Sequence, residues 1–311
     1  MKFKKLVILD KVDFFGNQKD QLKELADEVI IYDDTAKTRE EIIKRVGDAD
    51  AVITSWTDLD GSIIKEWSNV KYMGVYATGY GWIDVKTAID KGITVTNVPH
   101  YATESVAELI IGNLIALSRN TLKADKFTRS GEGKKEDLYG ENLKGKTIGI
   151  IGLGEIGRRV AELASAFGMN IIYSSRTKKD VSYEFCELRD LLKKSDVVSI
   201  NTSLNSQTEK LLGEKEFQLM KDDSIFINFV HGRVVDETAL AKFVEKGKIK
   251  AVIDDIQDEK AKKVFIKMKD RTVLTPHIGF YTKSSIKNLT QIVIDNADSY
   301  LKGNVQNKVP T

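Results

Sequence analysis

Short apolar runs alternate with amphipathic stretches along the chain, and this alternation predicts parallel β-strands joined by crossover helices. In the N-terminal third, the apolar runs predict strands at residues 5–9, 28–31, 51–54, 72–76 and 94–96. Helical spacing falls between them at residues 19–26 and 83–90. The segment Thr38-Arg-Glu-Glu41 has the form of a capping box that opens a helix to Val46.

A second series of apolar runs follows a long helical pattern that covers about residues 105–129. Its predicted strands lie at residues 147–151, 170–173, 197–200, 224–227, 251–253 and 272–274. A final helix at about residues 283–301 is long enough to return to the first series. With 311 residues, the chain can form two domains, each with its own core.

Composition limits the possible partners. Hydrophobic residues make up 41% of the chain and charged residues 30%, as in ordinary soluble globular proteins. The formal net charge is +2, from 48 basic and 46 acidic residues, so no nucleic-acid partner is expected and the lysine runs are interpreted as solvated faces. The single cysteine, Cys186, excludes an intrachain disulfide and a cysteine metal cluster, and no metal site is expected.

Membrane and export signals are weak. No segment approaches the ~20 apolar residues that a membrane helix requires. The N-terminal apolar run, residues 6–9, stops at Asp10 and is too short for the core of a signal peptide. The sequence therefore predicts a cytoplasmic protein without a membrane partner.

The segment around residues 147–157 carries the clearest chemical signal. An apolar run leads into Gly152-Leu153-Gly154-Glu155-Ile156-Gly157, and a helical pattern follows. This is GxGxxG in the strand–turn–helix context that dinucleotide binding requires, although an ordinary tight turn is the alternative. The first glycine makes the turn, the second lets backbone approach a pyrophosphate, and the third lets helix and strand pack closely. Free N–H groups at the helix N-terminus then face the anion.

Four blocks occur in the following order: residues 77–84 (ATGYGWID), residues 97–108 (NVPHYATESVAE), the glycine motif with residues 166–169 (AFGM), and residues 275–279 (TPHIG). Together they resemble the D-isomer-specific 2-hydroxyacid dehydrogenases, closest to the glyoxylate and hydroxypyruvate reductases. The resemblance implies an α/β fold of two doubly wound parallel-sheet domains. A Rossmann domain, residues 99–279, is inserted into a flavodoxin-like substrate domain of residues 1–98 and 280–311, and the active site lies in the cleft.

The resemblance also implies the catalytic residues. His277 in the TPHIG block corresponds to the acid/base histidine, and Glu259 to its acidic partner, at a spacing one residue shorter than is usual. During reduction a hydride reaches the carbonyl carbon while an imidazolium protonates the oxygen. A neighbouring carboxylate stabilises the charged imidazole near neutral pH.

One position departs from the family pattern. Asn-x-x-Arg-Gly appears here as Asn228-Phe-Val-His231-Gly232, so the arginine that holds the substrate carboxylate is His231. Three explanations stay open. Protonated His231 binds the carboxylate more weakly, or Arg233 swings in to replace the arginine, or the substrate lacks the usual carboxylate or turnover has been lost.

The resemblance places the substrate at Ala77 and at the backbone N–H groups of Thr78 and Gly79, with Trp56 and Tyr101 beside them. Tyr76 and Trp82 are further candidates for this side of the site. Each of these aromatic residues, taken alone, is more typical of core packing.

The cofactor is predicted to be NADP(H) in preference to NAD(H). NAD users place Asp or Glu after the second Rossmann strand, but here Ser175 takes that place, with Arg176 and Lys178 following. A carboxylate would repel a 2′-phosphate, whereas serine and basic side chains would accept it. The remaining contacts implied by position are Thr103, Val106, Ser174, Thr177, Thr202, Ser203, Thr208, Phe229, Val230, Asp254 and Gly279.

These observations predict an NAD(P)H-dependent reductase that converts a small 2-oxoacid, such as glyoxylate, hydroxypyruvate or pyruvate, to the D-2-hydroxyacid. Two alternatives rest on His231: a sensor that binds NAD(P)H without turnover, and a dehydrogenase with an unusual substrate. By analogy with relatives that dimerise through the cofactor domain and its long helix, a homodimer is expected.

Overall fold

The computed structural model describes residues 1–131 and 133–310, and the chain divides into two compact units. Unit 1 combines Met1–Tyr101 with the chain from Thr282 onward, and unit 2 is Ala102–Tyr281. The boundaries expected from the sequence, after residues 98 and 279, lie within three residues of these.

Unit 1 is built on a five-stranded parallel sheet with the order β2-β1-β3-β4-β5. The strands are β1 (Phe3–Ile8), β2 (Ala26–Ile31), β3 (Ala51–Thr54), β4 (Tyr72–Val75) and β5 (Thr94–Thr96). Successive strands are added on one side of β1 as far as β2, and then on its other side from β3 to β5. This is the flavodoxin-like strand order, and its switch point lies between β1 and β3. Val7, Val52 and Val95 lie in the core beneath its helices.

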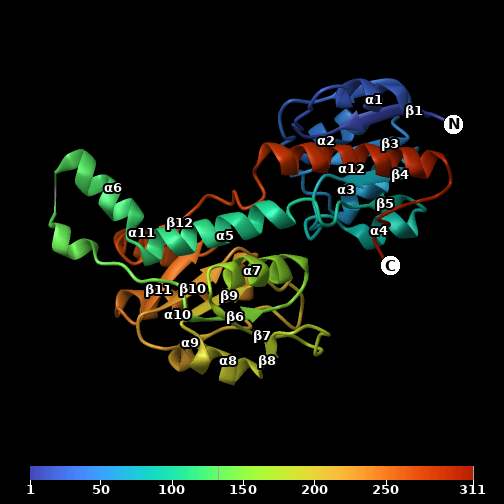
Figure 1. Cartoon of the computed structure of the whole chain (residues 1–311). Coiled ribbons are helices and arrows are strands. Elements are labelled where there is room, and N and C mark those ends of the chain that lie inside the picture. The colour runs from blue at the N-terminus through green and yellow to red at the C-terminus, as the bar shows by residue number, and fades with distance from the viewer. Residues whose placement is uncertain (132, 311) are drawn as a thin grey trace. The chain divides into compact units, whose positions relative to one another are not determined.

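Helices cover both faces of this sheet. They are α1 (Gln18–Glu24), α2 (Arg39–Val46), α3 (Gly61–Glu66), α4 (Val85–Asp90) and α12 (Lys283–Leu301). Figure 1 shows α12, in red, beside the blue N-terminal elements, where it packs against β4 and α1. The Gln18 amide donates to the Lys287 carbonyl at 2.8 Å, so the C-terminal helix is joined to α1 by hydrogen bonding as well as by packing.

The predicted capping box at α2 forms in part. Thr38 Oγ1 accepts from the Glu41 N–H at 3.2 Å, as the motif requires. The Glu41 carboxylate reaches past Thr38, however, and accepts from the Lys37 N–H at 2.9 Å.

Unit 2 is built on a seven-stranded parallel sheet with the order β12-β11-β10-β9-β6-β7-β8. The strands are β6 (Thr147–Ile151), β7 (Asn170–Ser174), β8 (Glu184–Phe185), β9 (Val197–Ile200), β10 (Ser224–Asn228), β11 (Ile249–Ile253) and β12 (Thr272–Leu274). Because the chain runs outward from β6 and then returns to β9, the switch point lies between these two strands. Ligands of such sheets bind at the carboxyl ends of the strands there.

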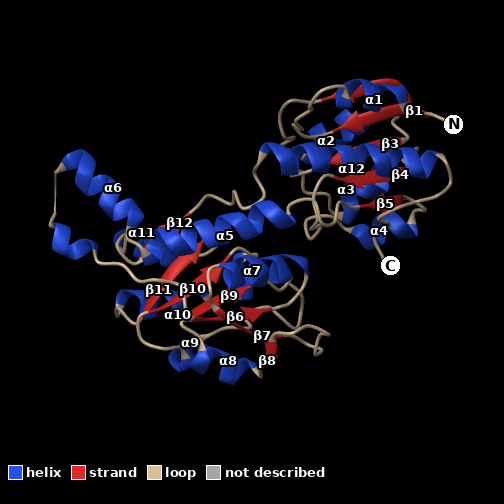
Figure 2. Ribbon diagram, in the orientation of Figure 1, coloured by secondary structure: helices blue, strands red, loops and turns tan. Residues whose placement is uncertain are grey.

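The helices of unit 2 are α5 (Thr103–Ser118), α6 (Thr121–Ser130), α7 (Glu155–Ala166), α8 (Leu188–Lys194), α9 (Glu214–Leu219), α10 (Glu237–Glu245) and α11 (Glu259–Lys267), with short 3₁₀ turns η1 (Lys135–Leu138) and η2 (Gly232–Val234). Except for α6, which has no buried residue, they pack in layers against the sheet. Figure 2 shows α5 and α7 together on one face and α8, α9 and α10 on the other. The predicted fold class, two doubly wound parallel-sheet domains, is confirmed.

The single helix predicted over about residues 105–129 is wrong. The structure has α5 and α6 instead, with a break at Arg119 and Asn120. Asn120 adopts a left-handed conformation with φ of 52°, which ends helical hydrogen bonding. Asparagine tolerates this conformation better than most residues, but the hydrophobic spacing on either side does not reveal it.

Within the described ranges, no helix combines the length and the apolar character needed to cross a membrane.

Candidate active site: a dinucleotide groove and a histidine loop

The glycine turn, residues 152–157, connects β6 to α7 and places each glycine where its missing side chain matters. Gly152 has φ of 91°, and a Cβ there would lie 2.9 Å from the Asn201 backbone. A Cβ on Gly157 would overlap the Gly152 carbonyl oxygen. A Cβ on Gly154 would meet nothing within 4 Å, so the turn leaves open space at the position where the motif brings a phosphate.

A groove of about 550 Å³ opens beside this turn, and we call it the dinucleotide groove. Its walls come from the segments that follow β6, β7 and β9, on either side of the switch point. It brings together the predicted cofactor residues Gly152, Leu153, Gly154, Ser174, Ser175, Arg176, Thr177, Thr202, Ser203 and Thr208. Space and position therefore fit a dinucleotide.

The other predicted cofactor residues lie outside the groove lining. Glu155, Ile156 and Gly157 form the first turn of α7. Thr103 begins α5, and its hydroxyl donates to the Glu155 carboxylate at 3.4 Å. Val106 is a buried residue of the same helix.

Phe229 and Val230 directly follow β10. A Cβ on Gly279 would lie 3.0 Å from the Phe229 ring, so these two predicted residues are neighbours. The Val230 N–H donates to the Asn228 side chain at 3.0 Å.

The part of the groove after β7 is basic. Arg176 and Lys179 line it, and no Asp or Glu occurs among its described lining residues. Ser175 Oγ donates to the Thr177 carbonyl at 2.7 Å, which folds the segment into a turn. The Lys179 ammonium donates to Thr177 Oγ1 at 3.2 Å. An anion placed here would meet hydroxyl groups and cations.

Sequence reasoning missed several lining residues, including Lys179, Asn201, Asn205 and Gln207. The Asn201 amide donates to the carbonyl and hydroxyl of Ser199 at 3.1 Å each. Its Oδ1 is buried and has no hydrogen-bond partner among the described residues. Polar residues directly after the apolar run at 197–200 were the available signal.

The second region of interest is the histidine loop, residues 275–279, which follows β12. Asp254 is buried, and its carboxylate accepts from Thr275 Oγ1 at 2.5 Å, the Ile278 N–H at 2.9 Å and the Gly279 N–H at 2.8 Å. The His277 N–H donates to the Asp254 carbonyl at 2.7 Å. Asp254, predicted as a cofactor contact, therefore acts here as the clamp of this loop.

The clamp presents the His277 side chain outward. The backbone of His277 is left-handed, with φ of 55°, and its ring is exposed with an edge-on contact to Phe280 at 5.7 Å between centroids. None of the described residues hydrogen bonds to its imidazole nitrogens. Both nitrogens are therefore available to a ligand.

Glu259 is the first residue of α11 and is exposed. Its carboxylate accepts from the Lys262 ammonium at 3.2 Å. No hydrogen bond between Glu259 and His277 occurs in the described part of the chain. Glu259 and His277, the predicted acid/base pair, are therefore not hydrogen bonded to each other in this conformation.

His231 is also exposed, at the start of η2, and its Nδ1 accepts from the Arg233 N–H at 3.2 Å. The Arg233 guanidinium donates to the Glu209 carboxylate at 2.7 Å. An Arg233 that replaced the family arginine would first have to leave Glu209.

Two buried carboxylates lie behind His231. Asp255 accepts from the Gly232 N–H at 3.1 Å, and Glu237 accepts from the N–H groups of Gln257 and Asp258. Burial raises the pKa of Glu237 above its ordinary value. A Cβ on Gly232 would overlap the Glu237 carboxylate, so a larger residue at this position would displace the Glu237 side chain.

In unit 1, Ala77, Thr78 and Gly79 follow β4. Thr78 Oγ1 donates to the Val98 carbonyl at 2.7 Å, and the Asn97 amide donates to the Thr78 carbonyl at 2.7 Å. Thr78 and Gly79 are exposed, and within the described ranges nothing accepts from their backbone N–H groups. Two adjacent free donors are suited to a carboxylate.

The aromatic candidates separate by burial. Tyr76 is buried, and its hydroxyl is 2.7 Å from Thr290 Oγ1, as in core packing. Tyr101 is mostly buried, and burial raises the pKa of its phenol. Trp56, by contrast, is 59% exposed. In the described residues, no three acidic, histidine or cysteine side chains gather to form a metal site.

Comparison with known proteins identifies related sequences and structures. The profile of the D-isomer specific 2-hydroxyacid dehydrogenase, NAD binding domain, matches residues 111–279. A glyoxylate reductase of Thermococcus litoralis is 37% identical over 288 residues, which cover 88% of this chain and 87% of that protein. A hydroxypyruvate reductase of Blautia hydrogenotrophica is 33% identical over 296 residues, covering 91% and 92%.

Solved structures agree over the whole chain. An acyclic imino acid reductase in complex with NADPH and D-Arg has a TM-score of 0.91 and 32% identity, covering 98% of this chain and all of that one. A glyoxylate reductase from Paecilomyes thermophila has a TM-score of 0.88 and 30% identity, covering 100% and 99%.

Proposed function

Because this chain belongs to the D-isomer-specific 2-hydroxyacid dehydrogenases, NAD(P)-dependent oxidoreductases that act on CH–OH donors, we propose that it reduces a small 2-oxoacid to the D-2-hydroxyacid with NADPH. The observation that carries the proposal is that one unit holds both a dinucleotide groove without Asp or Glu in its described lining and an exposed His277, whose loop is held by hydrogen bonds to Asp254. The relatives named glyoxylate and hydroxypyruvate reductase support the oxoacid class.

In this proposal the dinucleotide groove holds the cofactor, which supplies a hydride when bound. The N-terminus of α7 faces the pyrophosphate, with Gly154 leaving room for it. Ser175, Arg176 and Lys179 receive the 2′-phosphate, since hydroxyl and cationic groups favour a phosphate and a carboxylate would repel it. The neighbouring structure with NADPH supports this preference.

His277 is the proton donor in the proposed reaction. As an imidazolium it gives a proton to the substrate oxygen, which becomes the hydroxyl of the product. Glu259 stabilises that charge, for which its exposed carboxylate has to leave Lys262. Asp254 keeps the histidine loop in place through its three hydrogen bonds.

The N–H groups of Thr78 and Gly79 bind the substrate carboxylate, and His231 is its second contact. Histidine offers one N–H where arginine offers a fork, so the carboxylate is held less tightly. Arg233 stays with Glu209 in this scheme.

The direct test is NADPH consumption by the purified protein with glyoxylate, hydroxypyruvate and pyruvate. Turnover with release of the 2-hydroxyacid supports the proposal. Tight NADPH binding without turnover of any of the three acids would instead favour a cofactor-binding sensor.

A second candidate, reduction of an imino acid, is favoured by His231 together with the similarity to an acyclic imino acid reductase. Adding methylamine to the pyruvate assay distinguishes the two. If the imine is the substrate, N-methylalanine forms and NADPH consumption depends on the amine. If the oxoacid is the substrate, lactate forms with or without it.

We also propose a homodimer formed through unit 2. Helix α6 has no buried residue, and Leu122 and Tyr139 expose 59% and 88% of their surface. Large apolar side chains exposed in this way mark association surfaces. Light scattering of the parent should give twice the mass of 34.9 kDa, and the double variant Leu122→Lys, Tyr139→Lys should give the monomer mass.

A further inference from the structure

Two tryptophans of unit 1 form a stacked pair in the loops that follow the neighbouring strands β3 and β4. The rings of Trp56 and Trp82 lie 6.4 Å apart between centroids, with an interplanar angle of 18°. Their loops are joined by backbone hydrogen bonds from Leu59 N–H to the Trp82 carbonyl at 3.0 Å and from Asp84 N–H to the Leu59 carbonyl at 2.8 Å. Trp56 nevertheless leaves most of its surface uncovered.

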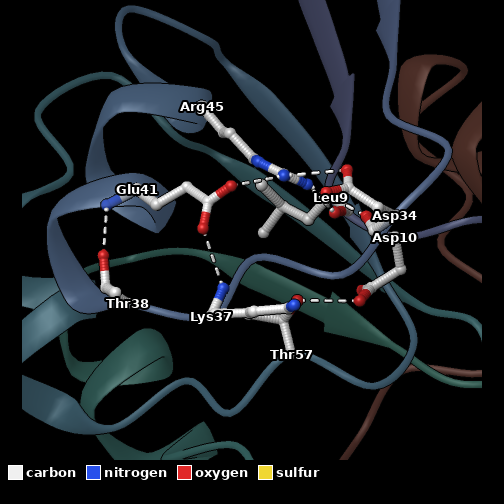
Figure 3. Close-up of polar contacts among 8 residues, drawn as sticks. All are labelled: Leu9, Asp10, Asp34, Lys37, Thr38, Glu41, Arg45 and Thr57. Carbon is white, nitrogen blue, oxygen red and sulfur yellow. Dashed lines mark hydrogen bonds and ion pairs between the residues drawn. The ribbon is translucent and has the colours of Figure 1, made fainter.

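The loop that carries Trp56 is fixed from beneath by a buried carboxylate. Asp10 is fully buried and accepts from Ser55 N–H at 2.7 Å, Thr57 Oγ1 at 2.8 Å and Thr54 Oγ1 at 3.1 Å. Figure 3 shows Asp10 reaching Thr57 beside the Arg45 network. Burying a carboxylate is costly unless its hydrogen bonds are satisfied, so this arrangement gives the loop one defined position.

Arg45 holds the backbone just before Asp10. Its guanidinium donates to the Leu9 carbonyl at 3.1 Å and to the carboxylates of Asp34 and Glu41 (Figure 3). It also lies over the Tyr32 ring, 4.2 Å from the centroid. Because Asp10 holds the residues on either side of Trp56, and Arg45 holds the backbone before Asp10, this exposed tryptophan loses little conformational entropy when a ligand covers it.

The pair adjoins the proposed carboxylate anchor. A Cβ built on Gly79 would lie 3.8 Å from Cζ3 of Trp82, which is van der Waals contact. In a 2-oxoacid the side chain starts only two carbons from the carboxylate carbon. A substrate held by the Gly79 N–H group therefore has its side chain within reach of Trp82 and then Trp56.

We propose that Trp56 and Trp82 form an aromatic wall that receives the side chain of the 2-oxoacid, so that acids with an arylmethyl side chain are preferred over glyoxylate. Stacking and apolar burial against the wall provide the preference. Glyoxylate has only hydrogen on its carbonyl carbon and leaves the wall uncovered. This inference rests on the proposed reductase function and names its substrate class.

The test compares kcat/KM for phenylpyruvate and for glyoxylate in the parent, Trp56→Ala and Trp82→Ala. The parent should prefer phenylpyruvate, and each variant should lower the phenylpyruvate-to-glyoxylate ratio by about tenfold, mainly through the KM for phenylpyruvate. Phe167→Ala is the matched control, since it removes a 45% exposed aromatic ring at the end of α7. Its ratio should equal that of the parent.

Asp10→Asn tests the support of the wall. It keeps the shape of the side chain but loses the charge that three donors share, and the ratio should fall by a smaller factor than in Trp56→Ala. Because Trp56 is exposed, Trp56→Ala should fold normally, which an unchanged circular dichroism spectrum and Tm verify.

A parent that prefers glyoxylate, or a ratio unchanged in both tryptophan variants, overturns the aromatic wall while leaving the reductase function in place. A protein that reduces none of phenylpyruvate, glyoxylate, hydroxypyruvate and pyruvate overturns the proposed function and this inference with it.

Discussion

The glycine turn after β6 and the histidine loop after β12 both follow the carboxyl end of a strand in one sheet. The glycine turn already has the geometry that its proposed role requires, whereas the histidine loop does not. In the glycine turn, backbone geometry alone makes the site: Gly152 has a positive φ, and Gly157 packs on a carbonyl oxygen. In the histidine loop the backbone is equally well defined, because Asp254 clamps it. The side chains that would do chemistry there, His277 and Glu259, do not meet.

The difference follows from what each site requires. A phosphate needs space and free N–H groups, which a short segment of fixed backbone supplies before any ligand arrives. The proposed proton transfer uses two side chains from separate elements, and catalytic hydrogen bonds of this kind are often completed only when substrate is bound. Binding and chemistry should therefore be separable by substitution.

The largest expected effect is that of His277→Ala. It should lower kcat by roughly a thousandfold, since a positioned general acid contributes on that order. NADPH affinity, measured by fluorescence titration, should change by no more than about twofold, because the ring is free of the dinucleotide groove. Comparable turnover in variant and parent would remove His277 from the mechanism.

Substitutions within the glycine turn should separate cofactor binding from folding. Gly154→Ala places a methyl group in the open space proposed for the pyrophosphate, and NADPH affinity should fall at least about tenfold with little change in Tm. Gly157→Ala presses on the Gly152 carbonyl and should cost roughly 1–3 kcal/mol of unfolding free energy. Equal effects on Tm would contradict the separate roles of the two glycines.

The basic end of the groove should set cofactor preference. The double variant Ser175→Asp, Arg176→Ala introduces a carboxylate and removes a cation, and the ratio of kcat/KM for NADPH to that for NADH should fall about tenfold or more. Steady-state kinetics with both cofactors measure it. An unchanged ratio would mean that these residues form only a solvated turn.

The smallest effect is expected where the family arginine is absent. His231→Arg should lower the KM for the oxoacid by about three- to tenfold, since a bidentate pair replaces a single hydrogen bond. Glu209→Gln is the matched control because it releases Arg233 without touching His231. A lower KM in Glu209→Gln would identify Arg233 as the carboxylate contact, and a higher KM in His231→Arg would indicate a different substrate.

The sequence predicted the strands and helices correctly where the apolar pattern runs unbroken over several residues. The strands at residues 51–54, 94–96, 147–151, 197–200 and 272–274 and the helix at 283–301 have the predicted bounds. Strands of a parallel sheet are buried on both faces and appear as unbroken apolar runs. The short helix α3 and the two-residue strand β8 were missed, because segments of that length carry too few positions to show a period.

The hydrogen-bond partners of individual side chains could not be predicted from the sequence. The break at Asn120 depends on the backbone of one residue, and the apolar spacing continues across it. The Lys262 partner of Glu259, the Glu209 partner of Arg233 and the loop clamp at Asp254 depend on rotamers and on elements distant in sequence. Asp10 is separated from its partners by more than forty residues and gave no pattern in the sequence.

The most direct measurement of the central claim is reduction of pyruvate with NADPH that carries deuterium on both C4 positions, followed by mass spectrometry and chiral analysis of the product. The account predicts D-lactate with one deuterium on C2, because the hydride passes from the cofactor to the oxo carbon and His277 supplies only the hydroxyl proton. Unlabelled lactate or the L isomer would contradict it.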